Sequence, residues 1–140
     1  MKVFIDSSAF LAIADTDDGH HEHGRLIFQD ILTKGAKLFS SNYILDETYT
    51  LIRARTNHQT VVNFIKSFEL SGITVLRVSP QIEDLAKRIF IKYSDKNFSF
   101  TDCTSFVLIN ENKIDATFAY DVHFRQYRYK HTVTYLTAIG

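Results

Sequence analysis

Short apolar runs alternate with longer segments of helical periodicity along the chain, and this alternation restricts the fold more than any other feature of the sequence. Strand-like composition occurs in Val3–Ile5, Lys37–Ser40, Ile73–Val78, Ala116–Tyr120 and Thr132–Leu136. Strands that alternate with helices are typical of βαβ units and a parallel sheet. Because helices cover both faces of such a sheet, its strands are nearly continuous apolar runs. The sequence therefore predicts an α/β fold, a three-layer α/β/α sandwich around a parallel sheet of about five strands.

The predicted helices fill the intervals between these runs. The clearest one follows Ser79-Pro80, a strong helix start, and carries an apolar stripe of Ile82, Leu85, Ala86, Ile89, Phe90 and Tyr93. The other helices are expected at Phe10–Ala14, His21–Leu32, Tyr43–Arg55, Gln59–Leu70 and Thr101–Asn112. Two of them are consecutive between the second and third strands, which makes the predicted sandwich slightly irregular. A chain of 140 residues without a linker or repeat suits one domain, residues 1–140.

The composition says more about the cellular compartment of the protein than about its substrate. The single cysteine, Cys103, excludes an internal disulfide, so nothing indicates an oxidising compartment. No apolar stretch approaches the roughly 18 residues of a membrane span, and the N-terminus lacks the apolar segment of a signal peptide. We therefore expect a cytoplasmic protein with no membrane association. The 16 basic and 16 acidic residues balance, so net charge neither favours nor excludes a nucleic-acid partner.

Four acidic residues occupy special positions relative to the predicted elements. Asp6 directly follows the first strand, and Asp121 directly follows Ala116–Tyr120. Glu47 and Asp102 fall near the starts of two predicted helices. Carboxyl ends of parallel strands and starts of the following helices meet at one rim of the sheet, where ligands bind. Each residue also has an ordinary explanation: Asp6 and Asp121 as N-caps, Asp102 in a capping box, and Glu47 at the positive end of a helix dipole.

A cluster of four carboxylates raises an electrostatic problem. Two carboxylates about 4 Å apart repel each other by about 4 kcal/mol at an effective dielectric constant near 20. Such a cluster must therefore bind a cation or take up protons. Ligation by oxygen alone favours a hard divalent ion such as Mg²⁺ or Mn²⁺. An ion of this kind, held by few carboxylates, is suited to phosphodiester hydrolysis because it acidifies water and stabilises charge on phosphoryl oxygens.

Four short motifs give the chain a family resemblance. They read FIDSSAFLA, NYILDETYTLI, FSFTDCTSFVLI and FAYDVHF in chain order. Together they resemble the PIN-domain nucleases, and within them the VapC-like toxins of toxin–antitoxin pairs, over nearly the whole chain. The resemblance implies a parallel sheet with flanking helices and a metal site formed by Asp6, Glu47, Asp102 and Asp121. It also implies an RNA substrate, a homodimer and an inhibitory antitoxin partner.

The resemblance suggests further roles around the metal site. Ser8 and Thr101 are expected to support the neighbouring aspartates as groups that hold a ligand or a bound water. Cys103 stands where a small residue such as alanine is more usual, which is a mild departure that should not affect the chemistry. The expected reaction is in-line attack of water on phosphorus, with Mg²⁺ or Mn²⁺ present, giving a 5′ phosphate and a 3′ hydroxyl.

Residues beside the acidic positions are candidates for substrate contact. His123 lies two residues after Asp121, and the segment from Arg125 to His131 interleaves basic and aromatic residues. This pattern suits phosphate contact and base stacking with single-stranded RNA, so His123, Arg125 and Arg128 are predicted to bind substrate. A solvated edge before the last strand explains the same segment equally well. For His20, His21 and His23 a zinc site is conceivable, and a solvated helix start is the favoured interpretation.

Other function classes fit the sequence less well. A phosphatase of the haloacid dehalogenase type needs a second aspartate where this chain has Ser8. A receiver-like signalling domain needs an aspartate after a middle strand, and Ile73–Val78 is followed by Ser79-Pro80 instead. A PIN-like domain that binds RNA or protein without cleaving it remains open at this point. Metal-dependent cleavage of a labelled RNA separates that alternative from the nuclease.

Overall fold

A parallel sheet forms the centre of the molecule in the computed structural model, which describes residues 1–139. In spatial order its strands are β3 (Thr74–Leu76), β2 (Lys37–Ser41), β1 (Lys2–Ile5), β4 (Ala116–Phe118) and β5 (Thr134–Tyr135). Every neighbouring pair is parallel. The chain proceeds from β1 outward through β2 to β3, and then returns to the other side of β1 to form β4. The strand order thus reverses between β1 and β4, which is where open α/β sheets bind their ligands.

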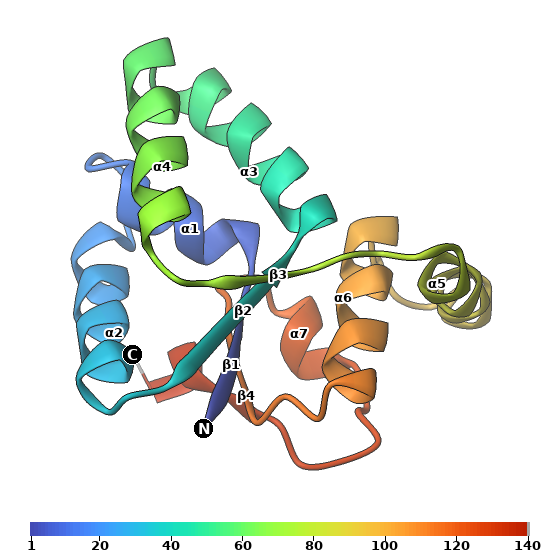
Figure 1. Cartoon of the computed structure of the whole chain (residues 1–140). Coiled ribbons are helices and arrows are strands. Elements are labelled where there is room, and N and C mark those ends of the chain that lie inside the picture. The colour runs from blue at the N-terminus through green and yellow to red at the C-terminus, as the bar shows by residue number, and fades with distance from the viewer. Residues whose placement is uncertain (140) are drawn as a thin grey trace.

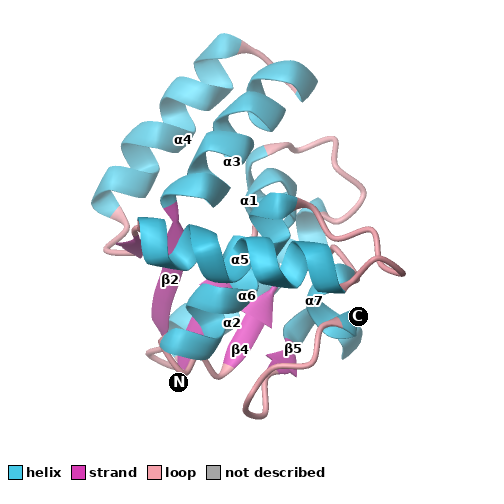
Figure 2. Cartoon of the chain, turned by 90° about the vertical axis from the view of Figure 1, so that its right-hand side faces the viewer, coloured by secondary structure: helices cyan, strands magenta, loops and turns pink. Residues whose placement is uncertain are grey.

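Helices cover both faces of the sheet, as the sequence predicts. On one side lies α2 (His21–Thr33), which packs against α1 (Ser7–Ala14). On the other side lies α6 (Phe100–Glu111), with α5 (Pro80–Lys92) on its outer surface (Figure 1). Figure 2 shows α5 lying across α6, in front of the sheet in that view. The three-layer α/β/α architecture is therefore confirmed, with a five-stranded parallel sheet in the described residues.

An antiparallel pair of helices extends beyond the carboxyl ends of the strands. These are α3 (Asn42–Arg55) and α4 (His58–Leu70), which stand above the sheet in Figure 1. They are the predicted consecutive helices between β2 and β3. Side chains of serine and asparagine cap both helices: Ser41 accepts a hydrogen bond from Ile44 N, and Asn57 accepts one from Thr60 N. The start of α3 is thereby fixed directly at the end of β2.

The central strand and α6 make up the most deeply buried part of the molecule. Val3, Phe4 and Ile5 of β1 have no exposed surface. Residues 102–109 of α6 are also buried, because the sheet covers one side of this helix and α5 covers the other. Burial of this many apolar side chains is the main stabilising contribution to such a fold. It also means that Asp6 and Asp102, at the ends of these elements, lie next to the core.

The observed elements differ from the predicted ones mainly at the end of β4. The run Ala116–Tyr120 was predicted as one strand, but β4 ends at Phe118. The amide of Tyr120 donates to Ser8 Oγ at 2.9 Å and so is not available for a strand partner. Asp121 therefore lies in a short loop after β4 and does not directly follow the strand. The four-residue helix α7 (His123–Gln126) and the 3-10 turn η1 (Leu136–Ile139) were not predicted, because both are too short for a periodic pattern.

Within the part of the chain that the structure describes, none of the helices combines the length and apolar character needed to cross a bilayer.

Candidate active site

Asp6 lies at the junction of β1 and α1, where it is the N-cap of the helix. Its carboxylate accepts hydrogen bonds from Ser8 N at 3.1 Å and from Ser8 Oγ at 2.6 Å. The side chain is almost completely buried, and this desolvation raises the pKa of Asp6 to about 7, despite the two hydrogen bonds from Ser8. The charges of Asp102 and Glu47 raise it further. A bound cation would therefore stabilise the ionised form of Asp6, which is buried next to other carboxylates.

Glu47 approaches Asp6 from α3, six residues after the N-cap Ser41. Its Oε1 accepts a short hydrogen bond from Ser7 Oγ, and Ser7 is the residue next to Asp6 in the chain. The contact joins the start of α1 to the first half of α3, which pack against each other. Glu47 is thereby directed toward the carboxyl end of β1, while its neighbour Asp46 is exposed.

Asp102 combines a helix cap with a position at the site. Ser99 is the N-cap of α6 and accepts from Asp102 N at 3.0 Å, and Asp102 Oδ2 accepts in return from Ser99 N at 3.0 Å. The same Oδ2 lies 2.8 Å from Nδ1 of His123. Burial raises the pKa of Asp102, although the hydrogen bond from Ser99 acts in the opposite direction. Asp102 thus takes part in the capping box of α6 and also contacts His123 of the acidic centre.

Asp121 and His123 complete the acidic centre from the loop after β4. Oδ1 of Asp121 accepts a hydrogen bond from the amide of His123 at 2.9 Å and lies 3.1 Å from its Nδ1. One ligand atom each from Asp102, Asp121 and His123 lies within 4.8 Å of the others. The edge of the Phe98 ring packs against the imidazole, with ring centroids 5.5 Å apart. His123 is therefore held between the carboxylates of Asp102 and Asp121. A cation bound to both carboxylates would neutralise their negative charge.

A cleft opens beside this centre at the carboxyl ends of β1 and β4. Among its lining residues are Asp6, Glu47 and Asp121, so three of the four predicted acidic residues face one open space. The other lining residues come from α1, α3 and the loops before α2 and after β4: Ser7, Ser8, Leu11, Asp18, His20, Leu51, Arg55 and Tyr120. Asp102 stands behind the opening and is linked to Asp121 through His123. The cleft thus gives a ligand access to the carboxylates.

The structure brings together most of the residues singled out from the sequence. Asp6, Glu47 and Asp121 line one cleft, Asp102 is joined to Asp121 through His123, and the Ser8 hydroxyl donates to Asp6. Thr101 differs, because its carbonyl oxygen accepts from the Thr104 and Ser105 hydroxyls, and no hydrogen bond joins its side chain to Asp102 in the described residues.

The three residues predicted to contact substrate lie in different settings. His123 lies inside the acidic centre and is not on its outer edge. Arg125 and Arg128 are exposed, and neither belongs to the residues found to line the cleft in the described part of the chain. The guanidinium of Arg125 lies 5.8 Å from the ring centre of Tyr135. Contact of these two arginines with RNA stays a prediction.

Sequence reasoning missed several residues of the cleft. Ser7, which holds Glu47, had no signal beyond its place beside Asp6. Tyr120 was assigned to the last position of a strand, and its position before Asp121 was the available signal. His20 was noticed only as part of a histidine group that was taken for a solvated helix start. Arg55, a basic residue late in α3, could from the sequence alone either reach substrate or complement the negative end of the helix, and the structure places it in the cleft.

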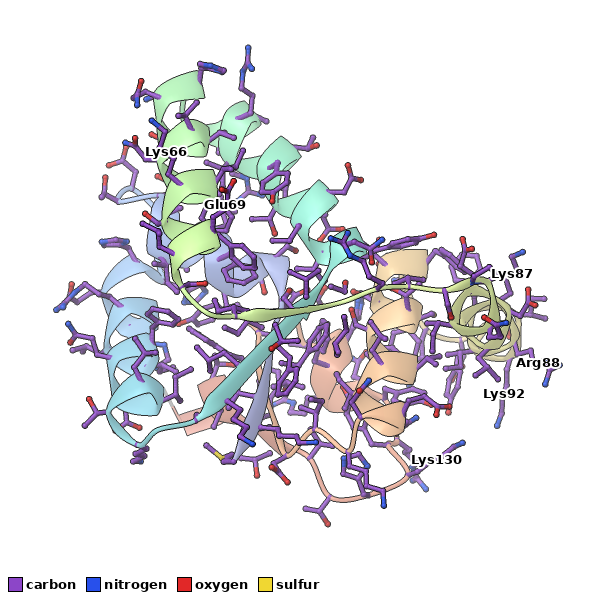
Figure 3. All side chains as sticks on the ribbon, viewed as in Figure 1. Lys66, Glu69, Lys87, Arg88, Lys92 and Lys130 are labelled. Carbon is purple, nitrogen blue, oxygen red and sulfur yellow. The ribbon has the colours of Figure 1, made fainter. Side chains whose placement is uncertain are left out.

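Basic side chains form a second, separate feature on the outer helix. Lys87, Arg88 and Lys92 project from α5, and Lys130 projects from the neighbouring loop (Figure 3). Lys87 lies 3.9 Å from Asp84, so part of this charge is balanced locally. Part of the positive charge of this neutral chain is thus concentrated on one local surface.

The donor set at the rim fits a hard divalent cation. Asp102, Asp121 and His123 offer two carboxylates and one imidazole close enough to share an ion, and the carboxylates of Asp6 and Glu47 line the adjoining cleft. The thiol of Cys103 is buried and does not belong to this set. In the described residues no lysine or arginine forms an ion pair with Asp6, Glu47, Asp102 or Asp121. Oxygen-rich sites of this type favour Mg²⁺ or Mn²⁺. The negative charge of these carboxylates, which no lysine or arginine in the described residues balances, is therefore suited to neutralisation by such an ion.

Comparison with known proteins gives the same picture of the fold. The family model described as the PIN domain matches residues 3–129. A relative in Mycobacterium tuberculosis, the 23S rRNA-specific endonuclease VapC20, is 25% identical over 122 residues, which cover 87% of this chain and 91% of that protein. A VapC ribonuclease of Archaeoglobus fulgidus is 29% identical over 127 residues, covering 89% of this chain and 80% of that protein.

Two solved structures resemble the chain over most of its length. The crystal structure of Mycobacterium tuberculosis VapC20, described as a sarcin–ricin loop cleaving toxin, superposes with a TM-score of 0.79 at 23% identity, covering 89% of this chain and 93% of that one. The structure of VapBC2 from Rickettsia felis, bound to a DNA fragment of its promoter, superposes with a TM-score of 0.69 at 9% identity, with 96% and 98% covered. At these identities the structures show a shared fold.

Proposed function

The chain belongs to the PIN-domain family, and we propose on this premise that it is a metal-dependent endoribonuclease that hydrolyses RNA phosphodiester bonds. The observation that carries the proposal is an acidic centre beside one open cleft: Asp6, Glu47 and Asp121 line the cleft, and Asp102 is joined to Asp121 through His123. Bringing these charges together is unfavourable unless a cation is bound among them. A fold that does so at its topological switch point has the arrangement of a metal centre.

Two groups of residues have different roles in the proposed site: the carboxylates would bind the ion, and neighbouring serines orient the carboxylates. Asp6, Glu47, Asp102 and Asp121 would hold Mg²⁺ or Mn²⁺. When bound, such an ion supplies an acidified water as nucleophile and stabilises charge on the phosphoryl oxygens. Ser8 fixes Asp6 and Ser7 fixes Glu47 through their hydroxyls, while Ser99 fixes Asp102 through its amide. Outer hydrogen bonds of this kind orient metal ligands before the ion binds.

RNA is favoured as the substrate by the relatives. VapC20 is named an endonuclease specific for 23S rRNA, and the Archaeoglobus protein is named a ribonuclease. The chemistry uses water as the nucleophile and needs no 2′ hydroxyl, so the products would carry a 5′ phosphate and a 3′ hydroxyl. We also propose a role as the toxin of a toxin–antitoxin pair, because VapC20 is described as a toxin. The VapBC2 neighbour supports an antitoxin protein as the partner. The homodimer and the cytoplasmic location stay predictions.

The alternatives drawn from the sequence are not favoured. A haloacid dehalogenase-type phosphatase is not favoured by the family assignment, and Ser8 occupies the place of its second aspartate. A non-catalytic PIN-like binding domain would have no need for four carboxylates at one rim. All four acidic positions of the resemblance are filled in this chain.

Cleavage of a labelled RNA tests the proposal. The purified chain, freed of metal, is incubated with a 5′-labelled single-stranded RNA in the presence of Mg²⁺, Mn²⁺ or EDTA. We expect cleavage with either ion and none with EDTA, and products that ligate through a 5′ phosphate. Equal cleavage in EDTA, or products with a 2′,3′-cyclic phosphate, would contradict the proposal. The variant Asp102→Asn is the control for contaminating nucleases, because only this chain's own activity disappears with it.

A further inference from the structure

Part of the cleft lining is aromatic; we call it the aromatic wall. The ring of His20 stacks on the ring of Tyr120, with centroids 4.1 Å apart and planes 12° from parallel. Both residues line the cleft that Asp6 and Asp121 also line. His20 is exposed, while Tyr120 is half-buried beneath it. A flat pair of rings thus borders the open space next to the acidic centre.

Tyr120 is tied firmly to that centre. Its amide donates to Ser8 Oγ at 2.9 Å, and the same hydroxyl donates to Asp6 Oδ2 at 2.6 Å. Tyr120 also directly precedes Asp121 in the chain. The position of the tyrosine ring is therefore fixed relative to two of the proposed metal ligands.

The start of α2 holds the same ring from the other side. The Tyr120 hydroxyl and Nδ1 of His23 lie 2.7 Å apart. Gly24 permits the close approach, because a Cβ at this position would lie 3.3 Å from the Tyr120 hydroxyl. The stacked pair is thus built by two distant segments, and it is more than a chance contact of surface side chains.

Neither helix capping nor zinc binding accounts for His20. It occupies the N-cap of α2 without any side-chain capping bond, where serine or aspartate would stabilise the helix better. The three neighbouring histidines do not converge on one point: Nδ1 of His21 bonds to the carbonyl of Ala12, and Nδ1 of His23 lies at Tyr120. In the described residues, the group of ligand atoms close enough for a metal is the one around His123. The zinc hypothesis for this segment therefore has no support in the structure.

Arg55 lies in the same cleft, near the end of α3. It is exposed and has no ion pair with an acidic residue in the described part of the chain. A cation and an aromatic pair in one cleft match the two parts of a nucleotide, since the guanidinium suits a phosphate and the rings suit a base. Stacking on aromatic side chains needs a base whose face is free, as in loops and single strands.

We propose that the His20–Tyr120 pair is a stacking platform for one unpaired nucleobase next to the scissile phosphate, with Arg55 at the adjoining phosphate. This inference rests on the proposed ribonuclease function and assigns its substrate class, namely single-stranded or looped RNA. The platform selects by the face of the base, so it accepts purines and pyrimidines alike. A base held in a duplex does not reach it.

Two variants of the exposed ring separate stacking from other roles. His20→Ala removes the outer ring of the pair, and His20→Phe restores an aromatic face without a titratable or hydrogen-bonding group. Binding is measured in EDTA, where the proposed function predicts no cleavage, using short single-stranded RNAs that carry 2-aminopurine at successive positions. We expect its fluorescence to be quenched at one position by the wild type and by His20→Phe, but not by His20→Ala. Binding should weaken about tenfold in His20→Ala, the scale of one base–aromatic stack.

An RNA with an abasic nucleotide at the quenched position provides the decisive arm. Removal of the base and removal of the His20 ring abolish the same stack. The wild type should therefore bind the abasic RNA about tenfold more weakly than the intact RNA, whereas His20→Ala should bind the two RNAs equally. Equal abasic penalties for the wild type and His20→Ala, or a His20→Phe variant as weak as His20→Ala, would overturn the platform. His58→Ala, which changes an exposed histidine outside the cleft, is the matched control and should bind like the wild type.

The failure of the platform and of the proposed function have different signatures. If the wild type cleaves single-stranded RNA with a divalent ion but shows no position of quenching, the platform is wrong and the nuclease stands. If the wild type cleaves no RNA under any metal condition, the ribonuclease proposal itself fails, and the platform, which rests on it, fails with it. Equal cleavage of duplex and single-stranded RNA by the wild type would overturn the assigned substrate class alone.

Discussion

The two walls of the cleft are built on opposite principles. The acidic wall is formed by Asp6, Glu47 and Asp121, with Asp102 behind it. Here Asp6 and Asp102 are buried and held by hydrogen bonds from Ser8 and Ser99. On the aromatic wall, the exposed ring of His20 stacks on Tyr120, while the backbone of His20 donates to the Asp18 carboxylate and accepts from the amide of Gly24. Chemistry at a metal centre needs ligands fixed before the ion arrives, whereas recognition of a flexible strand needs a surface that solvent and substrate can reach.

The difference has an energetic side. Burial raises the pKa of Asp6 and of Asp102, so the acidic wall is under electrostatic strain without a cation. The aromatic wall carries no such strain. Mutations on the acidic wall should therefore change activity strongly and leave stability equal or higher, whereas mutations on the aromatic wall should change binding moderately. The following experiments test whether the walls can be separated in this way.

The largest effect is expected from neutralising one carboxylate. Glu47→Gln should lower the rate of RNA cleavage on the order of a thousandfold, the scale of removing one preorganised group that stabilises the transition state. Asp46→Asn, the exposed neighbour on the same helix, is the matched control and should cleave like the wild type. Single-turnover cleavage measures both. Similar rates for the two variants would remove Glu47 from the centre.

The second effect is a change of stability with pH. Between about pH 4 and pH 7 the unfolded chain has lost the proton of Asp6 while the folded chain keeps it, because burial raises the pKa of this carboxyl from 3.8 to about 7. The free energy of unfolding of the metal-free protein should therefore receive from Asp6 a contribution that falls as pH rises through this window and levels off above pH 7. Asp6→Asn should lack that contribution, so the two curves should diverge with increasing pH.

Denaturant unfolding at several pH values, with EDTA present, measures this divergence. We expect Asp6→Asn to be more stable than the wild type at pH 8, and the difference to shrink toward pH 4. Adding Mn²⁺ should restore much of the wild-type stability at pH 8 and little at pH 5, where the folded chain still keeps the proton on Asp6. Parallel curves for the two proteins would show that Asp6 is not desolvated as described.

The third effect concerns Ser8, which joins the two walls. Its hydroxyl donates to Asp6 and accepts from the amide of Tyr120. Ser8→Ala should lower the free energy of unfolding by about 1–3 kcal/mol, because a partly buried amide loses its acceptor. Affinity for Mn²⁺ should fall by about 10–100-fold, as for other groups that orient a metal ligand. Calorimetry measures both. A change in stability without a change in affinity would separate Ser8 from the metal centre.

The smallest effect is expected from Gly24, on the aromatic wall. Gly24→Ala places a Cβ 3.3 Å from the Tyr120 hydroxyl, so the ring must shift by a few tenths of an ångström. The gain in helix propensity of about 1 kcal/mol roughly offsets the crowding, so stability should change little. The KM for single-stranded RNA should rise a few-fold with kcat unchanged, on the scale of a weakened base stack. Gly19→Ala, where nothing lies within 4 Å, is the control and should leave KM unchanged.

The acidic wall could be predicted from the sequence, whereas the aromatic wall could not. The acidic wall was accessible, because Asp6, Glu47 and Asp102 follow apolar or capping patterns that locate strand ends and helix starts. The aromatic wall was not, because the stack of His20 on Tyr120 joins segments a hundred residues apart in the chain. No local pattern encodes such a contact, and the same is true of the bond between Ser7 and Glu47.

The errors in the predicted elements have a related cause. The strand predicted through Tyr120 ends at Phe118 because a side chain of α1, Ser8, takes the next free amide. An apolar run shows where a strand can form, but a competing tertiary hydrogen bond decides where it ends. The place of His123 between Asp102 and Asp121 likewise depends on tertiary contacts that no local pattern in the sequence encodes.

The central claim is that residues 6, 47, 102 and 121 bind a divalent cation together. Titration of the metal-free protein with Mn²⁺, followed by the loss of the free-ion signal in electron paramagnetic resonance, tests it most directly. The account predicts saturable binding by the wild type at pH 8, a loss of affinity in each of Asp6→Asn, Glu47→Gln, Asp102→Asn and Asp121→Asn, and unchanged binding by Asp46→Asn. Wild-type affinity in all four single variants would contradict the account.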